Sequence, residues 1–174
     1  MKNNMLRILR YDLPLHFVLL ITNWLPDLII FIRLRGYLAH FFLGSCKKDL
    51  RLGRNITFYN PQNIHIGKNV YIACGNWFSA SEKITIEDEV IVGPYCIFSS
   101  SQHTKLNGSF RYGKALKNSI CIGKGSWITA QCNILAGTNI GEGVLVATNS
   151  VVSGNLTSHM MYAGSPAKII KDLK

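Results

Sequence analysis

The sequence predicts a mainly β protein, a parallel β-helix of about five coils preceded by an apolar helical segment. Two observations support this fold class. Beyond residue 51, aliphatic side chains recur with a period of six, which neither an α-helix nor a simple strand produces. Residues 1–51 instead carry apolar runs flanked by Arg and Lys. The 174 residues therefore divide into an N-terminal segment, 1–51, and a repeat domain, 52–174.

The apolar run at residues 13–32 does not predict a membrane span. Crossing a bilayer takes about 20 predominantly apolar residues, and Pro14, Pro26 and Asp27 interrupt this one. Because Pro26 should end or bend a helix, we expect two short helices with a bend near residues 24–27.

Cationic side chains flank these apolar pieces. Together with Trp24 and Tyr37, residue types typical of membrane interfaces, they favour helices that contact a membrane surface through residues 1–45. The alternative is that the helices only pack on the rest of the protein or on a neighbouring subunit. We expect a cytoplasmic protein whose membrane contact is the inner face of the cytoplasmic membrane. The flanking cations are Lys2, Arg7, Arg10, Arg33 and Arg35.

Charge and cysteine content narrow the function classes. The net charge of +10 suits anionic partners, but no uninterrupted basic run and no nucleic-acid-binding motif appears, so no nucleic-acid partner is expected. The five cysteines include no C-x-x-C pair. A disulfide framework or structural zinc site is therefore not expected, and a reducing cytosol is the better interpretation.

The most regular repeat begins at residue 122. Three six-residue units make one coil, so residues 122–139 and 140–157 predict two regular coils whose aliphatic positions face inward. Cys96 and Cys132 fall in a compact inward position, and we expect both to be buried. The aliphatic positions are Ile122, Ile128, Ile134, Ile140, Val146 and Val152.

The same phase extends toward the N-terminus. Residues 66–83 and 86–103 predict two more coils, separated by a slip of two residues at 84–85, and residues 52–65 make an irregular first coil. The repeat breaks over residues 104–119, which predicts an extruded loop.

These residues resemble the hexapeptide-repeat acyltransferases, whose β-helix is left-handed. The resemblance covers residues 52–170 and is most specific over 134–141 (ILAGTNIG) and 163–170 (AGSPAKII). It is closest in kind to the O-acetyltransferase branch, which includes maltose, galactoside, capsule and O-antigen acetyltransferases. It implies a left-handed β-helix that ends in a short C-terminal cap helix.

The resemblance further implies an acetyl-CoA-dependent O-acetyltransferase. The N-terminal segment is similar to the apolar extensions of capsule and O-antigen acetyltransferases, which favours a sugar hydroxyl of a surface polysaccharide or its intermediate as acceptor. Two alternatives stay open, an acetyltransferase for small drug-like alcohols and a non-catalytic structural protein.

Acyl transfer to an alcohol needs a base for the hydroxyl proton and donors for the oxyanion. His103 closes the 86–103 coil just before the loop, so a rigid coil would hold it while solvent could reach it. The resemblance implies that His103 is the general base and that attack on the thioester is direct. No second histidine stands in a neighbouring six-residue unit, so no metal is expected. The other histidines, expected to be structural, are His16, His40, His65 and His159.

The resemblance also implies a homotrimer in which coenzyme A lies along the coils between two subunits. The implied coenzyme contacts are Trp127 beside the pantetheine, the Ala130 backbone N–H toward the thioester oxygen, Thr148 and Ser153 along the arm, and Lys168 near the phosphates. The implied acceptor contacts are Asn76, in the coil below His103, and Lys105, Arg111 and Tyr112 in the loop.

Overall fold

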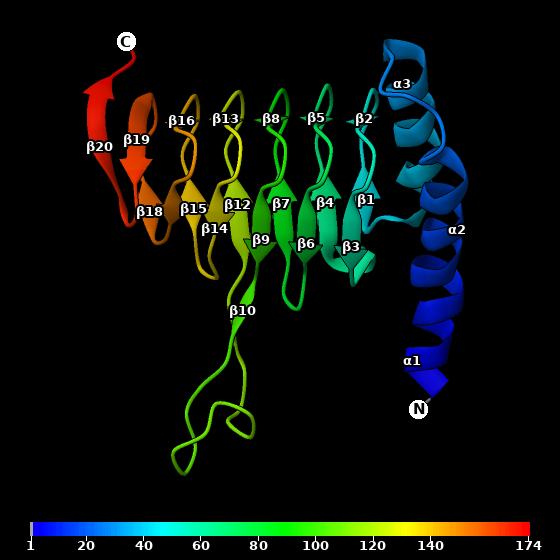
Figure 1. The fold of residues 1–174 in the computed structure, drawn as a ribbon, viewed down its shortest axis with the longest axis horizontal. Coiled ribbons are helices and arrows are strands. Elements are labelled where there is room, and N and C mark those ends of the chain that lie inside the picture. The colour runs from blue at the N-terminus through cyan, green and yellow to red at the C-terminus, as the bar shows by residue number, and fades with distance from the viewer. Residues whose placement is uncertain (1) are drawn as a thin grey trace.

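The six-residue period produces a three-sided β-prism in the computed structural model, which describes residues 2–174 and the side chains of residues 5–174 (Figure 1). Short parallel strands stack into three sheets, one on each side of the prism. Sheet A has six strands, sheet B seven and sheet C five. Each complete coil contributes one strand to each sheet, so the strands of a sheet come from successive coils.

The strand bounds follow the coils in order. Sheet A contains β1 (Ser45–Cys46), β4 (Ile64–Ile66), β7 (Ile84–Ile86), β12 (Ile120–Ile122), β15 (Asn139–Ile140) and β18 (Asn155–Leu156). Sheet B contains β2 (Arg51–Leu52), β5 (Tyr71–Ile72), β8 (Ile91–Val92), β13 (Trp127–Ile128), β16 (Leu145–Val146), β19 (Met160–Gly164) and β20 (Ala167–Asp172). Sheet C contains β3 (Thr57–Tyr59), β6 (Trp77–Ser79), β9 (Ile97–Ser99), β14 (Asn133–Ile134) and β17 (Val151–Val152).

The prism has about six turns, the last one incomplete, rather than the five that the sequence predicts. The additional first coil begins at Ser45, inside the segment expected to be helical. Its strand β1 places Cys46 opposite Ile66, 20 residues later. Because a cysteine replaces the aliphatic residue and the offset is 20 rather than 18, the six-residue period does not reveal this coil.

The coil register confirms the predicted slip. Ile66 pairs with Ile86, an offset of 20 residues, whereas Ile122 pairs with Ile140, an offset of 18. The coils at 122–139 and 140–157 are therefore regular at their start, and the coil before them is longer by two residues, as predicted.

Stacked side chains fill the interior of the prism. All six aliphatic residues of the regular repeat are buried, and so are Cys96 and Cys132, as predicted. On the inner side of sheet C, the rings of Phe58, Phe78 and Phe98 stack with centroid distances of 5.1 and 4.6 Å. Identical or similar residues therefore repeat above one another, which is what holds successive coils in register.

The expected C-terminal helix is absent from the described residues, and this prediction was wrong. The chain turns at Gly164, where φ is +103°, and β20 returns antiparallel to β19, so that Ala163 pairs with Lys168. The β-branched pair Ile169 and Ile170 suits a strand better than a helix. The returning strand covers an edge of the last coil that would otherwise expose unpaired backbone groups.

Helices cover the other end of the prism (Figure 1). The first runs through α1 (Lys2–Arg7), the π-helical turn η1 (Ile8–Asp12) and α2 (Leu13–Thr22), and the second is α3 (Ile29–Ala39). The predicted bend therefore lies between α2 and α3. Short 3-10 turns follow at η2 (His40–Phe42) and η3 (Pro61–Asn63). No helix within residues 2–174 is both long and apolar enough to cross a membrane.

Arg35 of α3 attaches the helices to the first coil. Its side chain is fully buried and pairs with Asp27 at 3.1 Å. It also donates hydrogen bonds to the carbonyl oxygens of Thr22, Leu25 and Leu52 at 2.6–3.0 Å. The expectation that Arg35 faces lipid headgroups was therefore wrong, because this guanidinium satisfies carbonyls at the end of α2 and on the outermost strand of sheet B.

Candidate active site

His103 stands at the base of a long loop that leaves the prism between sheets C and A (Figure 1). It directly follows β10 (Ser101–Gln102), which pairs antiparallel with β11 (Leu116–Lys117). The next residue, Thr104, donates a 2.6 Å hydrogen bond from Oγ1 to the carbonyl oxygen of Lys114. His103 is exposed, so its imidazole is held at a braced position and stays open to a substrate.

The serines before His103 anchor the loop to the coil. Ser100 is fully buried and donates from Oγ to the carbonyl oxygens of Ser79 and Glu82, at 3.1 and 3.0 Å. Ser101 Oγ donates to Ser81 Oγ at 3.2 Å. The predicted junction of rigid coil and extruded loop is therefore present at this position.

Ala130 and Thr148 lie one above the other where the chain turns from sheet B to sheet C. Both follow aligned strands, because Ile128 pairs with Val146. Within residues 2–174 the Ala130 N–H donates to no acceptor, whereas the next amide, that of Gln131, donates to Pro94 O at 2.9 Å. The corner thus leaves one backbone donor free for a ligand.

Gly93 packs directly against this corner from the coil before it. A Cβ added at Gly93 would lie 2.7 Å from the carbonyl carbon of Thr129 and 2.8 Å from the nitrogen of Ala130. Such distances are too short for any side chain, so glycine is required for the coils to approach one another here.

Gly93→Ala is accordingly expected to lower the free energy of unfolding by about 1–3 kcal/mol, since the backbone at Thr129 and Ala130 must move. Denaturant unfolding followed by circular dichroism measures this loss. The matched control is Ala147→Gly, which removes a Cβ at the equivalent corner of the next regular coil and should cost less than about 1 kcal/mol. Equal losses in the two variants would refute the steric explanation.

Trp127 lies on the outer side of sheet B with nearly half of its side-chain surface exposed. It lines a hollow of about 440 Å³ together with Tyr71, Gly93 and Pro94. Lys168 is on β20 of the same sheet, three strands further along the prism. At about 4.8 Å per strand, the two residues are roughly 14 Å apart along the axis, which suits an elongated ligand.

The remaining predicted residues are separated from this group. Ser153 follows β17 and therefore stands at the corner between sheets C and A, on the same corner as His103 but on the opposite edge of sheet C from Ala130. Lys105, Arg111 and Tyr112 are exposed in the extruded loop. One chain alone thus keeps His103 and Ala130 on different edges of a sheet.

Asn76 is not available to an acceptor. Its side chain is fully buried and its Nδ2 donates to the carbonyl oxygens of Ala73 and Gly93, at 2.7 and 2.9 Å. Its Oδ1 accepts from the Cys96 N–H at 2.9 Å. These bonds satisfy all the polar groups of the corner, so the structure gives Asn76 a structural position instead of the acceptor contact expected for it.

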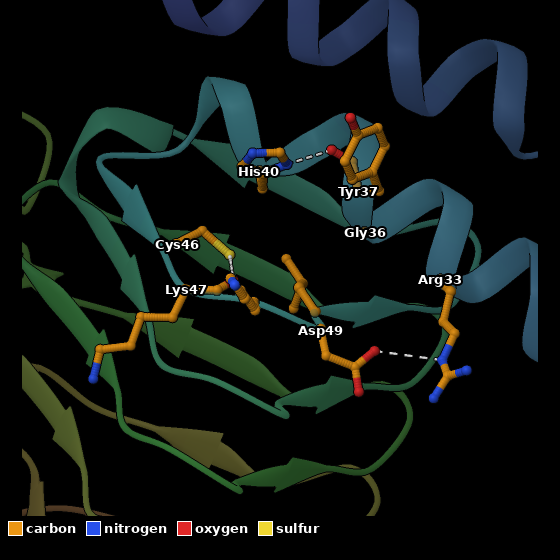
Figure 2. Close-up of a pocket in the computed structure, with 9 residues that line it drawn as sticks. Arg33, Gly36, Tyr37, His40, Cys46, Lys47 and Asp49 are labelled. Atoms are coloured by element: carbon orange, nitrogen blue, oxygen red, sulfur yellow. Dashed lines mark hydrogen bonds and ion pairs between the residues drawn. The ribbon is translucent and has the colours of Figure 1, made fainter.

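A separate cavity of about 530 Å³, which the sequence did not predict, lies between α3 and the first coil (Figure 2). Arg33 and Tyr37 line it from α3, and Lys47, Lys48 and Asp49 line it from the first coil. Hydrogen bonding from Arg51 lowers the pKa of Asp49, and this carboxylate also pairs with Arg33 at 3.4 Å. The cavity has a cationic rim at the helical end of the prism.

Metal-ligating side chains do not gather in the part of the chain that the structure describes: no three His, Cys, Asp or Glu residues are placed to hold an ion. The other histidines are dispersed. His65 Nδ1 bonds to Ser45 Oγ at 2.8 Å, and burial, with a contribution from Lys83, lowers its pKa. His159 occupies a corner with φ of +61°, and His16 and His40 lie in the helical segment.

Known proteins resemble this chain in sequence. No protein-family model matches it. The galactoside O-acetyltransferase of Escherichia coli K12 is 26% identical over 118 residues, which cover 68% of this chain and 58% of that protein. The candidate lipopolysaccharide biosynthesis O-acetyl transferase WbbJ of the same organism is 29% identical over 132 residues, with coverages of 68% and 62%. The chain spans less than two thirds of the length of these relatives.

Solved structures resemble it in fold. A galactoside acetyltransferase in complex with coenzyme A superposes with a TM-score of 0.82 at 22% identity, covering 93% of this chain and 80% of that one. A maltose O-acetyltransferase from Clostridium difficile 630 gives 0.82 at 24% identity, covering 99% and 90%. At these identities the likeness establishes the shared fold.

Proposed function

Because the chain belongs to the hexapeptide-repeat acetyltransferases, in the branch of the galactoside, maltose and WbbJ-like O-acetyltransferases, we propose that it transfers an acetyl group from acetyl-CoA to a sugar hydroxyl. The observation that carries this proposal is the placement of His103, which is exposed and braced at the base of the extruded loop. A base in this position can meet an acceptor hydroxyl without moving the prism.

The residues of the B–C corner fit a thioester. The free Ala130 N–H can donate to the carbonyl oxygen, and the negative charge that develops there during attack strengthens such a bond. Trp127 offers an exposed apolar surface beside this donor, and Lys168 offers a cation further along the same sheet. Thr148, stacked on Ala130, extends the path by one coil.

In the proposed reaction His103 accepts the proton of the acceptor hydroxyl while the oxygen attacks the carbonyl carbon of the thioester. The carbon–sulfur bond then breaks, the acetyl ester forms, and the released thiolate takes up a proton. No covalent acyl-enzyme is needed, because His103 only moves a proton.

We further propose a homotrimer, since His103 and the Ala130 corner lie on different edges of sheet C within one chain. A second prism would bring its own corner against the first chain's His103 and complete the site. Apolar residues on the outer side of sheet B, among them Ile91 and Trp127, are exposed and would be covered in such an assembly. Ser153, on the His103 corner, would then face the partner's coenzyme arm.

The proposed acceptor is a sugar of a surface polysaccharide or its precursor. Lys105, Arg111 and Tyr112 are free in the loop to contact a hydroxyl-rich or anionic acceptor. The name of the relative WbbJ refers to lipopolysaccharide biosynthesis, and that of another to galactosides, which agrees with a sugar acceptor.

An acceptor-dependent thiol-release assay tests the function. We expect acetyl-CoA to release free thiol faster in the presence of a reactive sugar from a panel of galactosides, glucosides and nucleotide sugars, with the acetyl ester found by mass spectrometry. Reactions without acceptor are the control for hydrolysis. Thiol release with drug-like alcohols and with none of the sugars would overturn the sugar proposal, and release with neither class would favour a non-catalytic protein.

A further inference from the structure

Each N-terminal helix has an apolar side that faces away from the prism. In α2 the buried residues are Leu15, Leu19 and Thr22. At 100° per residue, the exposed apolar residues stand on the opposite side of the helix. They are Leu13, Phe17, Leu20, Ile21 and Trp24, with exposed fractions of 43–87%.

The second helix repeats this arrangement. Its buried residues include Ile32, Arg35 and Ala39, which face the first coil. The exposed apolar residues lie opposite them at helical spacing, and they are Ile30, Leu34, Tyr37 and Phe41. We call the two exposed stripes together the outer face. It closes the end of the prism that is opposite β20 (Figure 1).

A surface of this kind requires a partner. Soluble proteins rarely expose a contiguous apolar patch of several helical turns, and a helix with apolar residues on both sides is normally covered on both. The prism covers only the inner sides. The outer sides are therefore an interaction surface.

The charges around the outer face favour an anionic partner. All three acidic residues of the N-terminal segment are neutralised by arginine: Asp12 by Arg7, Asp27 by Arg35 and Arg54, and Asp49 by Arg33 and Arg51. By contrast, within the described residues Arg10 and Lys48 have no acidic side chain at ion-pair distance. Lys48 lies on the rim of the cavity that Tyr37 of the outer face also lines.

We propose that the outer face docks on the surface of an anionic lipid bilayer, with the apolar stripes in the headgroup boundary and the cations against the headgroups. A second copy of the chain meeting this face would bring unpaired cations together, which disfavours it as the occupant. Lys2, another expected cation, has its side chain outside the described residues. This proposal does not depend on acetyl transfer.

Sedimentation with lipid vesicles tests the docking. The full chain is expected to bind phosphatidylcholine vesicles that contain phosphatidylglycerol more tightly than pure phosphatidylcholine vesicles, and added salt should weaken the difference. Ile21→Ser/Trp24→Ser should lower binding at least about tenfold, because it removes two large side chains from the boundary region.

The matched control is Ile170→Ser/Leu173→Ser, which removes two exposed apolar side chains from the opposite end of the prism. It should bind vesicles as the parent does. If the double outer-face variant did not fold, Trp24→Ala alone, at the most exposed position, replaces it. No vesicle binding by the parent, or equal losses in both variants, would overturn the proposal. Lipid-free association that Ile21→Ser/Trp24→Ser dissolves would also overturn it, in favour of a second copy.

Discussion

Replacing His103 with alanine is expected to lower kcat/KM for acetyl transfer by about 10²- to 10⁴-fold, the usual contribution of a positioned general base. The melting temperature should not change, because the imidazole is exposed and lies outside the packed interior. Acceptor-dependent thiol release measures the rate, and thermal unfolding measures the stability.

Two controls separate the role of a base from that of a loop residue. His103→Gln retains polarity and much of the shape but cannot take up the proton, so it should lose as much activity as His103→Ala. His16→Ala removes a histidine that is exposed in α2 and should leave the rate unchanged. Partial recovery of His103→Ala by added imidazole would support proton transfer. An alanine variant as fast as the parent would refute the general-base assignment.

Arg35→Met is expected to lower the free energy of unfolding by about 3–5 kcal/mol. The substitution leaves Asp27 without its shortest ion pair and the carbonyl oxygens of Thr22, Leu25 and Leu52 without a donor. Burial lowers the pKa of Arg35 and the charge of Asp27 opposes that shift, so the buried cation depends on this carboxylate. Denaturant unfolding measures the loss.

Arg33→Met is the matched control, because Arg33 lies two residues away and pairs with Asp49 while 55% of its side chain is exposed. An exposed pair contributes little, so the expected loss is below about 1 kcal/mol. Arg35→Lys should fall between the two, since a single ammonium cannot reach four acceptors. Equal losses at Arg33 and Arg35 would show that the buried network does not hold the helices on the coil.

Much of the prism could be predicted because one physical rule repeats along the chain. A residue such as Ile128 faces inward for the same reason as Ile122 and Ile134, so a period of six identifies all of them. The rule is silent where the inward residue is not aliphatic, as at Cys46, and beyond the last coil. There the chain returned as a strand, since pairing with β19 satisfied more backbone groups than a free helix would.

The candidate site was predictable in part. His103 could be found because it stands where the period breaks. Asn76 could have been excluded by the same register, since it pairs in position with Cys96 and so occupies an inward slot. The burial of Arg35 and the cavity at Lys48 could not be read from the sequence, because both depend on contacts between α3 and a first coil that has no regular period.

The extruded loop separates two kinds of information in the chain. Ile86 pairs with Ile122, 36 residues later, so the chain leaves the prism and returns to the next coil in the same register. The length of the loop therefore does not affect the stacking above and below it, and a longer loop costs little closure entropy. Selection can then remodel the part that meets the acceptor while the coils that receive the thioester stay unchanged, which lets one scaffold diverge toward many sugars.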